Sequence, residues 1–284
     1  MILLTGATGN TGRETAKLLA QAGVPFRALI RNPDKAGPLE ELGAEVAIGD
    51  FGDADALRQA LTGVDKVYLV TPNEEQQAQW ERQFVELAKD AGVGHVVYLS
   101  SMESVPGAKT PVTQAHVATE QQLRESGMAW TMVRPTFFNQ LLLAAAKGVK
   151  EKNAIVFPLG KGPLVTTDVR DIAAVITLAL TQPGHENQSY DITGPDLVTM
   201  DEVAAIFTKV LGREIRYVDQ PIEDFANILR AIGVNEWRVK AVCDELTEIS
   251  HGSLTRRTDT IEKLLGRPPI SIEQFVQDYR AAFE

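Results

Sequence analysis

The chain has 284 residues, of which 44% are hydrophobic and 23% charged, a composition typical of an ordinary globular protein with one large or two small domains. Its formal net charge of −10, with Lys and Arg dispersed along the chain, disfavours nucleic acid as a partner, and a single cysteine excludes an intrachain disulfide. No apolar run is long enough to span a bilayer and no leader-like segment precedes the first expected strand. We therefore expect a cytoplasmic protein that does not associate with a membrane.

The first elements predict a dinucleotide-binding loop. An apolar strand over 1–4 runs into three glycines spaced three apart, and a helix over 12–22 follows at once. This order aims the free N–H groups of a helix N-terminus at an anion, and glycine lets a pyrophosphate approach the backbone. The alternative is a tight turn that only allows the helix to pack on the strand. The predicted phosphate-binding residues are Gly6, Thr8, Gly9, Asn10, Thr11 and Gly12.

The second expected strand, 26–30, is followed by basic residues. At this point of a dinucleotide fold an acidic side chain binds the ribose 2′-hydroxyl, whereas an arginine accommodates a 2′-phosphate. The chain has Arg31 here, with Lys35 shortly after it. We therefore predict NADPH in preference to NADH; the alternative is a solvated loop arginine.

The third expected strand, 45–48, ends in Asp50 and Phe51. A short polar side chain and an aromatic ring at this place can flank an adenine, and a plain strand-to-helix turn is an equally good interpretation.

Two further strands, 66–70 and 95–99, complete a predicted Rossmann-type, doubly wound parallel sheet of the α/β class with right-handed crossovers. We expect His95, at the start of the fifth strand, to lie at the surface. Open α/β sheets bind ligands beyond the carboxyl ends of their strands. The residues at these two ends are Thr71, Pro72, Asn73, Ser100, Ser101 and Met102, and we expect them to contact the cofactor.

Several motifs resemble those of a known family. Segments 5–12, 30–33, 49–51 and 100–102 are similar to the atypical short-chain dehydrogenase/reductases, and segments 116–120 and 185–187 resemble the NmrA-like branch. The resemblance covers most of the chain and is strongest over 1–134. It implies NADPH binding and, because the branch includes bacterial NADPH:quinone oxidoreductases and triphenylmethane reductases, reduction of a flat conjugated acceptor.

The usual acid/base pair of that superfamily, Tyr-x-x-x-Lys after the fifth strand, is absent. None of the five tyrosines has Lys four positions later. If Glu120 matches the Glu that often follows that Lys, His116 stands in place of the Lys and Val112 in place of the Tyr. Valine cannot transfer a proton, so alcohol dehydrogenation and sugar epimerisation by the usual route are disfavoured.

His116 and Glu120 are the candidate catalytic residues. Being four apart, they share one face of a helix, where Glu120 can orient the imidazole and raise its pKa. His116 would then bind the nicotinamide ribose or supply a proton. The alternative is a surface pair that contributes little. The four histidines and one cysteine are too scattered to predict a metal site.

After a sixth strand, 130–134, Pro135 is expected to contact the cofactor. Phe137, Phe138 and Asn139 are expected to contact the substrate, with the aromatic rings as an apolar wall unless both belong to the core. A helix is expected to open at 165 and a late strand at 189–193. The predicted domains are a dinucleotide-binding domain over 1–150, with 164–195 returning to the sheet, and a smaller, mainly helical substrate-side lobe over 196–284.

These observations predict an NADPH-dependent reductase that transfers hydride to a quinone or dye-like small molecule. The alternative is an NADP(H)-binding, redox-sensing regulatory protein with little or no catalysis.

Overall fold

The computed structural model describes all 284 residues, and the chain divides into two compact units. Unit 1 comprises Met1–Pro135 and Val169–Asp191, and unit 2 comprises Thr136–Asp168 and Ile192–Glu284. Relative to the boundaries expected from the sequence, residues 136–150, 164–168 and 192–195 group with the second unit. No helix is both long enough and apolar enough to cross a membrane.

Unit 1 is built on a seven-stranded sheet in the order β10-β6-β5-β4-β1-β2-β3. All neighbouring pairs from β6 to β3 are parallel, which confirms the predicted doubly wound class. Strands β1 and β5 are buried along their whole length, as expected for strands covered on both faces. The strands are β1 (Ile2–Leu4), β2 (Phe26–Ile30), β3 (Glu45–Ile48), β4 (Lys66–Leu69), β5 (His95–Leu99), β6 (Ala129–Pro135) and β10 (Gln188–Ile192).

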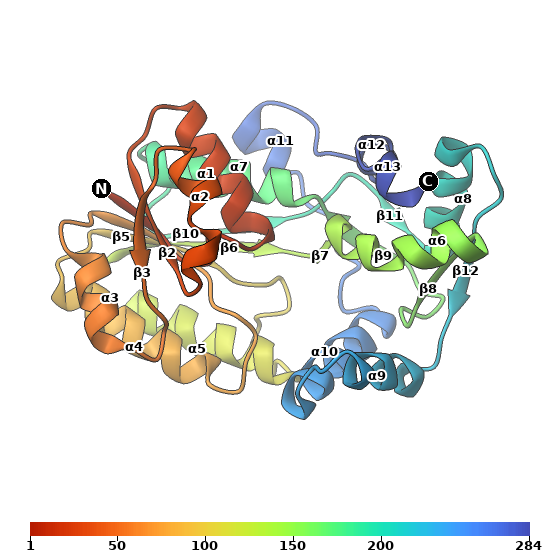
Figure 1. Cartoon of the computed structure of the whole chain (residues 1–284), viewed down its shortest axis with the longest axis horizontal. Coiled ribbons are helices and arrows are strands. Elements are labelled where there is room, and N and C mark those ends of the chain that lie inside the picture. The colour runs from red at the N-terminus through yellow and green to blue at the C-terminus, as the bar shows by residue number, and fades with distance from the viewer. The chain divides into compact units, whose positions relative to one another are not determined.

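Helices cover both faces of this sheet. In Figure 1, α1 packs with α7 on one face, and α3, α4 and α5 lie side by side on the other. Local chemistry sets their starts: Asp53 caps α3, and Thr110 forms a capping box with Thr113 at the start of α5. The helices are α1 (Asn10–Gln21), α2 (Gly37–Glu40), α3 (Ala54–Leu61), α4 (Gln77–Asp90), α5 (Pro111–Glu125) and α7 (Val169–Thr181), with a 3-10 turn at Pro33–Lys35.

His95 corrects one expectation, because it is a core residue with only 3% of its surface exposed. Its Nε2 lies 2.8 Å from the Thr131 hydroxyl, which in turn donates to the His185 carbonyl at 2.6 Å. Nε2 therefore carries the proton, and the buried Nδ1 has no partner. Burial lowers the pKa of His95 to about 4.

Unit 2 contains two small sheets and most of the remaining helices. The strands form the orders β11-β9-β7 and β12-β8, and Phe207, Phe275 and Phe283 pack edge to face in the helical core. The expectation of a helix from 165 was wrong over its first residues, since 164–167 is strand β9 and the helix begins at Val169. The elements are β7 (Phe137–Phe138), a 3-10 helix (Asn139–Ala145), α6 (Ala146–Lys152), β8 (Ala154–Phe157), β9 (Leu164–Thr167), β11 (Leu197–Val198), α8 (Met200–Leu211), β12 (Arg216–Asp219), α9 (Ile222–Ala231), α10 (Glu236–Ser250), α11 (Thr260–Leu265), α12 (Ile272–Asp278) and α13 (Arg280–Phe283).

Candidate functional site

The loop between β1 and α1 presents an open helix N-terminus. Gly9 caps α1 without any side-chain hydrogen bond, and Gly9 and Asn10 are both exposed. The first N–H groups of the helix therefore have no side-chain acceptor, and the helix dipole adds a positive potential at the same place. An anionic group fits this position.

The three glycines meet different steric requirements. Gly6 has a φ of +57°, which side-chain-bearing residues rarely adopt. A Cβ on Gly12 would lie 2.2 Å from the Gly6 carbonyl oxygen, so only glycine allows the helix to pass the loop this closely. A Cβ on Gly9 would lie 3.2 Å from the same oxygen, on the exposed side of the loop. The residues present thus fit the phosphates of a dinucleotide.

Two threonines anchor this loop to β4. The Thr5 hydroxyl donates to the Val70 carbonyl at 2.9 Å and accepts from the Val70 N–H at 2.8 Å. The Thr11 hydroxyl bonds the buried Tyr68 hydroxyl at 2.7 Å. Of the predicted phosphate ligands, Thr11 is therefore available through its backbone, because its side chain already has a partner.

Arg31 extends into solvent at the carboxyl end of β2. Three quarters of its side chain is exposed, and its Nη1 lies 3.8 Å from the Asp50 carboxylate at the end of the neighbouring strand β3. Lys35 is also exposed, in the 3-10 turn that follows. The structure thus brings Arg31 and Asp50 together and leaves both basic side chains accessible to a ligand.

Phe51 differs from its prediction as a residue that flanks an adenine. Its ring is buried in the core of unit 1, where it stacks on Trp80 with centroids 6.4 Å apart and meets Phe84 edge-on at 5.7 Å. With 8% of Phe51 exposed, its ring offers little surface to an adenine. The presence of an aromatic residue at this position is therefore explained by apolar packing of the strand-to-helix turn, the alternative interpretation of the sequence.

At the end of β4, the side chain of Thr71 points into the core of unit 1 and is already hydrogen-bonded there. It is buried, and its hydroxyl donates to Glu81 Oε1 at 2.5 Å. Pro72 is exposed and Asn73 half-buried. Of the three predicted contacts at this strand end, the accessible surface therefore belongs to Pro72 and Asn73.

The loop after β5 is tied to its neighbours. The buried Ser100 hydroxyl donates to Glu120 Oε1 at 2.7 Å, and the Met102 N–H donates to the carbonyl of the buried Pro135 at 3.1 Å. Ser101 accepts a hydrogen bond from the Glu103 N–H at 3.1 Å. Ser101 and Met102 are half-buried and carry the accessible surface of this strand end.

Glu120 differs from its predicted role as the partner of His116. Its carboxylate, 2% exposed, accepts from Ser100 and from the guanidinium groups of Arg124 and Arg134. Although burial alone would raise the pKa of this carboxyl, the hydrogen bonds from Arg134 and Ser100 outweigh it and hold the pKa below its usual value. Glu120 therefore stays ionised at neutral pH and fastens α5 to the ends of β5 and β6.

His116 finds its hydrogen-bond partner on β5 instead. Its Nδ1 lies 2.5 Å from the hydroxyl of Tyr98, which also lies 3.0 Å from Glu81 Oε2. The imidazole is half-buried, and its Nε2 has no partner in the chain. Burial lowers the pKa of His116, against the opposing charges of Glu81 and Glu120. The predicted rise in the pKa of His116 is thus wrong in sign, because desolvation outweighs the neighbouring carboxylates.

Glu81 and Tyr98 are the functional candidates that the sequence prediction missed. Glu81 has no exposed surface and accepts hydrogen bonds from four side chains, those of Thr71, Gln77, Tyr98 and Thr119. The available signal was a glutamate on the apolar face of α4, one turn from Gln77 and from Val85. Val112, at the position of the missing acid/base tyrosine, is buried.

The predicted substrate residues lie in unit 2. Phe137 pairs with Thr166 of β9, and its buried ring meets Phe157 edge-on with centroids 6.0 Å apart. Phe138 is half-buried, so of the two rings it keeps the more accessible surface. Asn139 is 1% exposed, and its Oδ1 has no hydrogen-bond partner.

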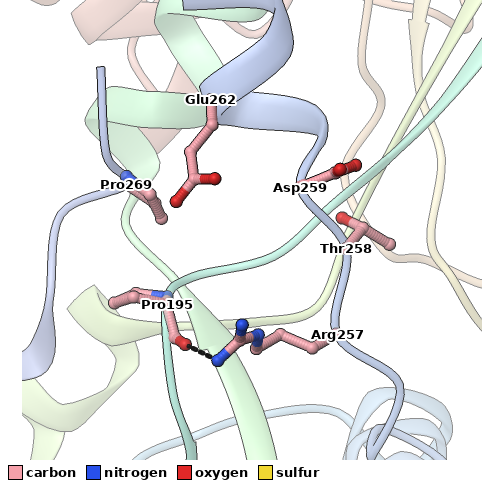
Figure 2. Close-up of a pocket in the computed structure, with 6 residues that line it drawn as sticks. All are labelled: Pro195, Arg257, Thr258, Asp259, Glu262 and Pro269. Atoms are coloured by element: carbon pink, nitrogen blue, oxygen red, sulfur yellow. Dashed lines mark hydrogen bonds between the residues drawn. The ribbon is translucent and has the colours of Figure 1, made fainter. Parts of the chain in front are cut away.

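Unit 2 also contains an open hollow of about 510 Å³ lined by Pro195, Arg257, Thr258, Asp259, Glu262 and Pro269. Figure 2 shows Arg257 donating to the Pro195 carbonyl, a bond of 2.7 Å, and Asp259 pairs with Lys263 at 2.8 Å. None of the predicted site residues lines this hollow.

The glycine loop, the basic strand end and the parallel sheet together define a dinucleotide-binding α/β protein. The chain belongs to the NmrA-like family, whose model matches residues 1–266. It is 39% identical to an NAD(P)H azoreductase of Xenophilus azovorans over 283 residues, which cover 100% of this chain and 99% of that protein.

Two solved structures have the same fold over their whole length. An NADPH-dependent quinone oxidoreductase from Escherichia coli, complexed with NADPH, is 30% identical with a TM-score of 0.87, covering 99% of this chain and 100% of that one. A Citrobacter triphenylmethane reductase complexed with NADP(H) is 27% identical with a TM-score of 0.86, covering 98% and 99%. These homologues are NAD(P)H-dependent oxidoreductases, as the motif resemblance implied.

Proposed function

We propose that the protein is an NADPH-dependent reductase that transfers hydride to a flat conjugated acceptor such as a quinone or a dye-like compound. The observation that carries the proposal is the exposed, uncapped N-terminus of α1, which presents unpaired N–H groups beyond the carboxyl end of β1. The names of the azoreductase, the quinone oxidoreductase and the triphenylmethane reductase support the acceptor class.

Arg31 and Lys35 support the choice of NADPH. Both are exposed close to the end of β2, where the adenosine ribose of a dinucleotide is bound in this fold class. The nearby Asp50 carboxylate offsets part of the Arg31 charge, and Lys35 supplies a second cation. Two cations around one carboxylate favour a doubly charged 2′-phosphate over a neutral hydroxyl.

The side chains of unit 1 favour acceptors that need no acid. When bound, the dihydronicotinamide supplies the hydride. The buried Val112 donates no proton and Glu120 stays ionised, so neither residue protonates a product. A quinone that gains a hydride becomes a hydroquinone anion, which takes its proton from water, whereas a simple ketone would require an acid at the moment of transfer.

Phe138 is the proposed acceptor contact, because its half-buried ring offers an apolar face. Asn139, although its Oδ1 has no hydrogen-bond partner, is 1% exposed and offers no surface to an acceptor molecule.

A steady-state assay of NADPH oxidation with a panel of quinones, azo dyes and triphenylmethane dyes tests the proposal. We expect turnover with at least one class and a lower KM for NADPH than for NADH. If the protein binds NADPH but no acceptor accelerates its oxidation, the reductase is excluded and the regulatory alternative takes its place. In that case the bound dinucleotide would alter association with a partner instead.

A further inference from the structure

The buried carboxylate of Glu81 lies at one end of a chain of hydrogen bonds that ends at His116. The chain crosses three elements of unit 1: Glu81 on α4, Tyr98 on β5 and His116 on α5, the two helices packing side by side (Figure 1). Tyr98 is fully buried and stands between the other two, with its hydroxyl 3.0 Å from Glu81 Oε2 and 2.5 Å from His116 Nδ1.

The direction in which the Tyr98 hydroxyl donates its one proton determines which ring nitrogen of His116 is protonated. A carboxylate only accepts hydrogen bonds, so at 3.0 Å from Glu81 the hydroxyl must donate to it; otherwise two oxygen lone pairs would face each other in a buried site. The Tyr98 oxygen is then left to accept, and the hydrogen bond at 2.5 Å is satisfied only if His116 carries its proton on Nδ1.

We propose that Glu81 and Tyr98 are positioning residues that hold neutral His116 in the Nδ1-protonated tautomer, which leaves Nε2 as the acceptor for a ligand hydroxyl. The hydroxyl belongs either to the ribose of the dinucleotide or to the reduced acceptor. The tautomer itself is independent of the proposed reductase function; only the identity of the hydroxyl rests on it.

The titratable groups around the imidazole support a neutral form. Glu81 from α4 and Glu120 from the same helix act to raise the pKa of His116, and desolvation outweighs them. Burial, reinforced by Glu81, raises the pKa of Tyr98 well above its usual value, so the phenol keeps its proton at every working pH. A neutral His116 cannot act as an acid through Nε2.

Long-range ¹H–¹⁵N spectra of the histidine rings in the full-length, ligand-free protein test this assignment directly. We expect Nδ1 protonated and Nε2 unprotonated at His116, and the opposite tautomer at His95, whose Nε2 donates to Thr131. A proton on Nε2 of His116 in the wild-type protein overturns the proposal.

Glu81→Gln should invert the tautomer. In the orientation that Gln77 has in the structure its Nε2 donates to residue 81, so the new amide keeps its oxygen toward Gln77 and turns its NH₂ toward Tyr98 and Thr119, whose hydroxyls can accept. Tyr98 then donates to Nδ1, and the His116 proton moves to Nε2. Because the Gln77 amide can also turn its unpartnered Oε1 toward the new NH₂, Tyr98→Phe is measured beside this variant, and a tautomer unchanged in both overturns the proposal.

Glu86→Gln is the matched control, because it removes the same charge from an exposed position of the same helix. It should leave His116 unchanged, and a shift of the tautomer here would contradict a route through Tyr98. His95 reports whether the fold is kept. If Glu81→Gln does not fold, Tyr98→Phe carries the test, since it removes the acceptor of the Nδ1 proton and should lower the population of that tautomer.

Adding NADP⁺ alone, and then a hydroquinone, identifies the hydroxyl. A shift of the His116 Nε2 resonance with NADP⁺ assigns the ribose, and a shift that requires the hydroquinone assigns the reduced acceptor; no shift with either overturns the acceptor role. In Glu81→Gln the Nε2–H would donate to that hydroxyl, so the hydrogen bond reverses its direction and the affinity for that ligand should change by no more than about fivefold. An absence of quinone turnover with the expected tautomer would reject the proposed function alone.

Discussion

Arg31 is the residue on which the choice of dinucleotide depends. Its guanidinium has a single ionic partner, Asp50 at 3.8 Å, and is mostly solvated, so little is lost from the fold when it is removed. Arg31→Ala should weaken NADPH binding by about 10- to 100-fold, the effect of one or two charge-assisted hydrogen bonds, and change NADH binding by less than about threefold.

Binding titrations with both dinucleotides measure this, with Arg58→Ala as the control. Arg58 is an exposed arginine of the same unit that pairs only with Asp55, and its loss should change neither affinity. Equal losses of NADPH and NADH affinity in Arg31→Ala would show that Arg31 does not face the 2′-phosphate.

His95 links the stability of unit 1 to pH. In the unfolded chain its pKa returns to about 6.5, whereas in the core it is about 4, so the unfolded state binds the extra proton between these values. The contribution of neutral His95 to the unfolding free energy is therefore complete above pH 6.5. It is lost as the pH falls toward 4, and the total loss is about 3 kcal/mol. His95→Gln, which can still donate to Thr131, should flatten this part of the profile in urea unfolding. An equally steep fall in the variant would assign the dependence to other groups.

At the residue scale, the role of a side chain could be predicted where it follows from the local spacing of residues along the chain. Gly12 and Arg31 follow from the order of strand, loop and helix, and the structure keeps both where a dinucleotide fold needs them. Phe51 and His95 were misjudged because one lies in the turn after β3 and the other at the start of β5, where the sequence does not reveal what covers the side chain. In each case packing from α4 or a partner on β6 decides the outcome.

At the scale of elements, two glycines of the β1–α1 unit have different roles. Gly12 is required for packing, whereas Gly9 is proposed to contact the phosphates. Gly12→Ala would place a Cβ 2.2 Å from a backbone oxygen that cannot rotate away, so it should destabilise unit 1 by at least about 1–3 kcal/mol. Gly9→Ala meets the same oxygen at 3.2 Å and points outward, so it should be tolerated in folding and weaken NADPH binding.

Urea unfolding combined with NADPH titration distinguishes these variants. The control is Gly37→Ala, because nothing lies within 4 Å of its Cβ position and its φ is not positive. This variant should change neither stability nor affinity. A folded Gly12→Ala protein with wild-type stability would contradict the close packing of α1 on the loop.

Buried polar residues on α4 limited the prediction of the site at this scale. The buried face of α4 contains the polar residues Gln77 and Glu81 beside apolar ones, whereas the large apolar side chain of Trp80 is only half-buried. Because a glutamate on a helix is normally expected at the surface, the sequence did not single out Glu81, and with it the partner of Tyr98. The small strands β9 and β12 were missed for a different reason, since each consists of only four residues and pairs with a segment distant in sequence.

At the scale of the molecule, the two units differ in how far their strands could be predicted. The parallel, doubly wound class of unit 1 could be predicted because its first five strands alternate with helical segments, whereas its strand order was not predicted. Unit 2 could not, because its strands 137–138 and 197–198 are too short to give a period.

Dinucleotide binding should stabilise the molecule unevenly. A ligand present at 100 times its Kd adds about 2.7 kcal/mol to the unfolding free energy of the state that binds it. Because every proposed phosphate contact comes from unit 1, hydrogen exchange with NADPH should slow most at amides 10–13, whose first members have no acceptor in the helix, and around Arg31. NADH at the same concentration should protect 10–13 less and leave the Arg31 segment unprotected. Slowing confined to unit 2 would contradict the placement of the cofactor on the β1–α1 loop.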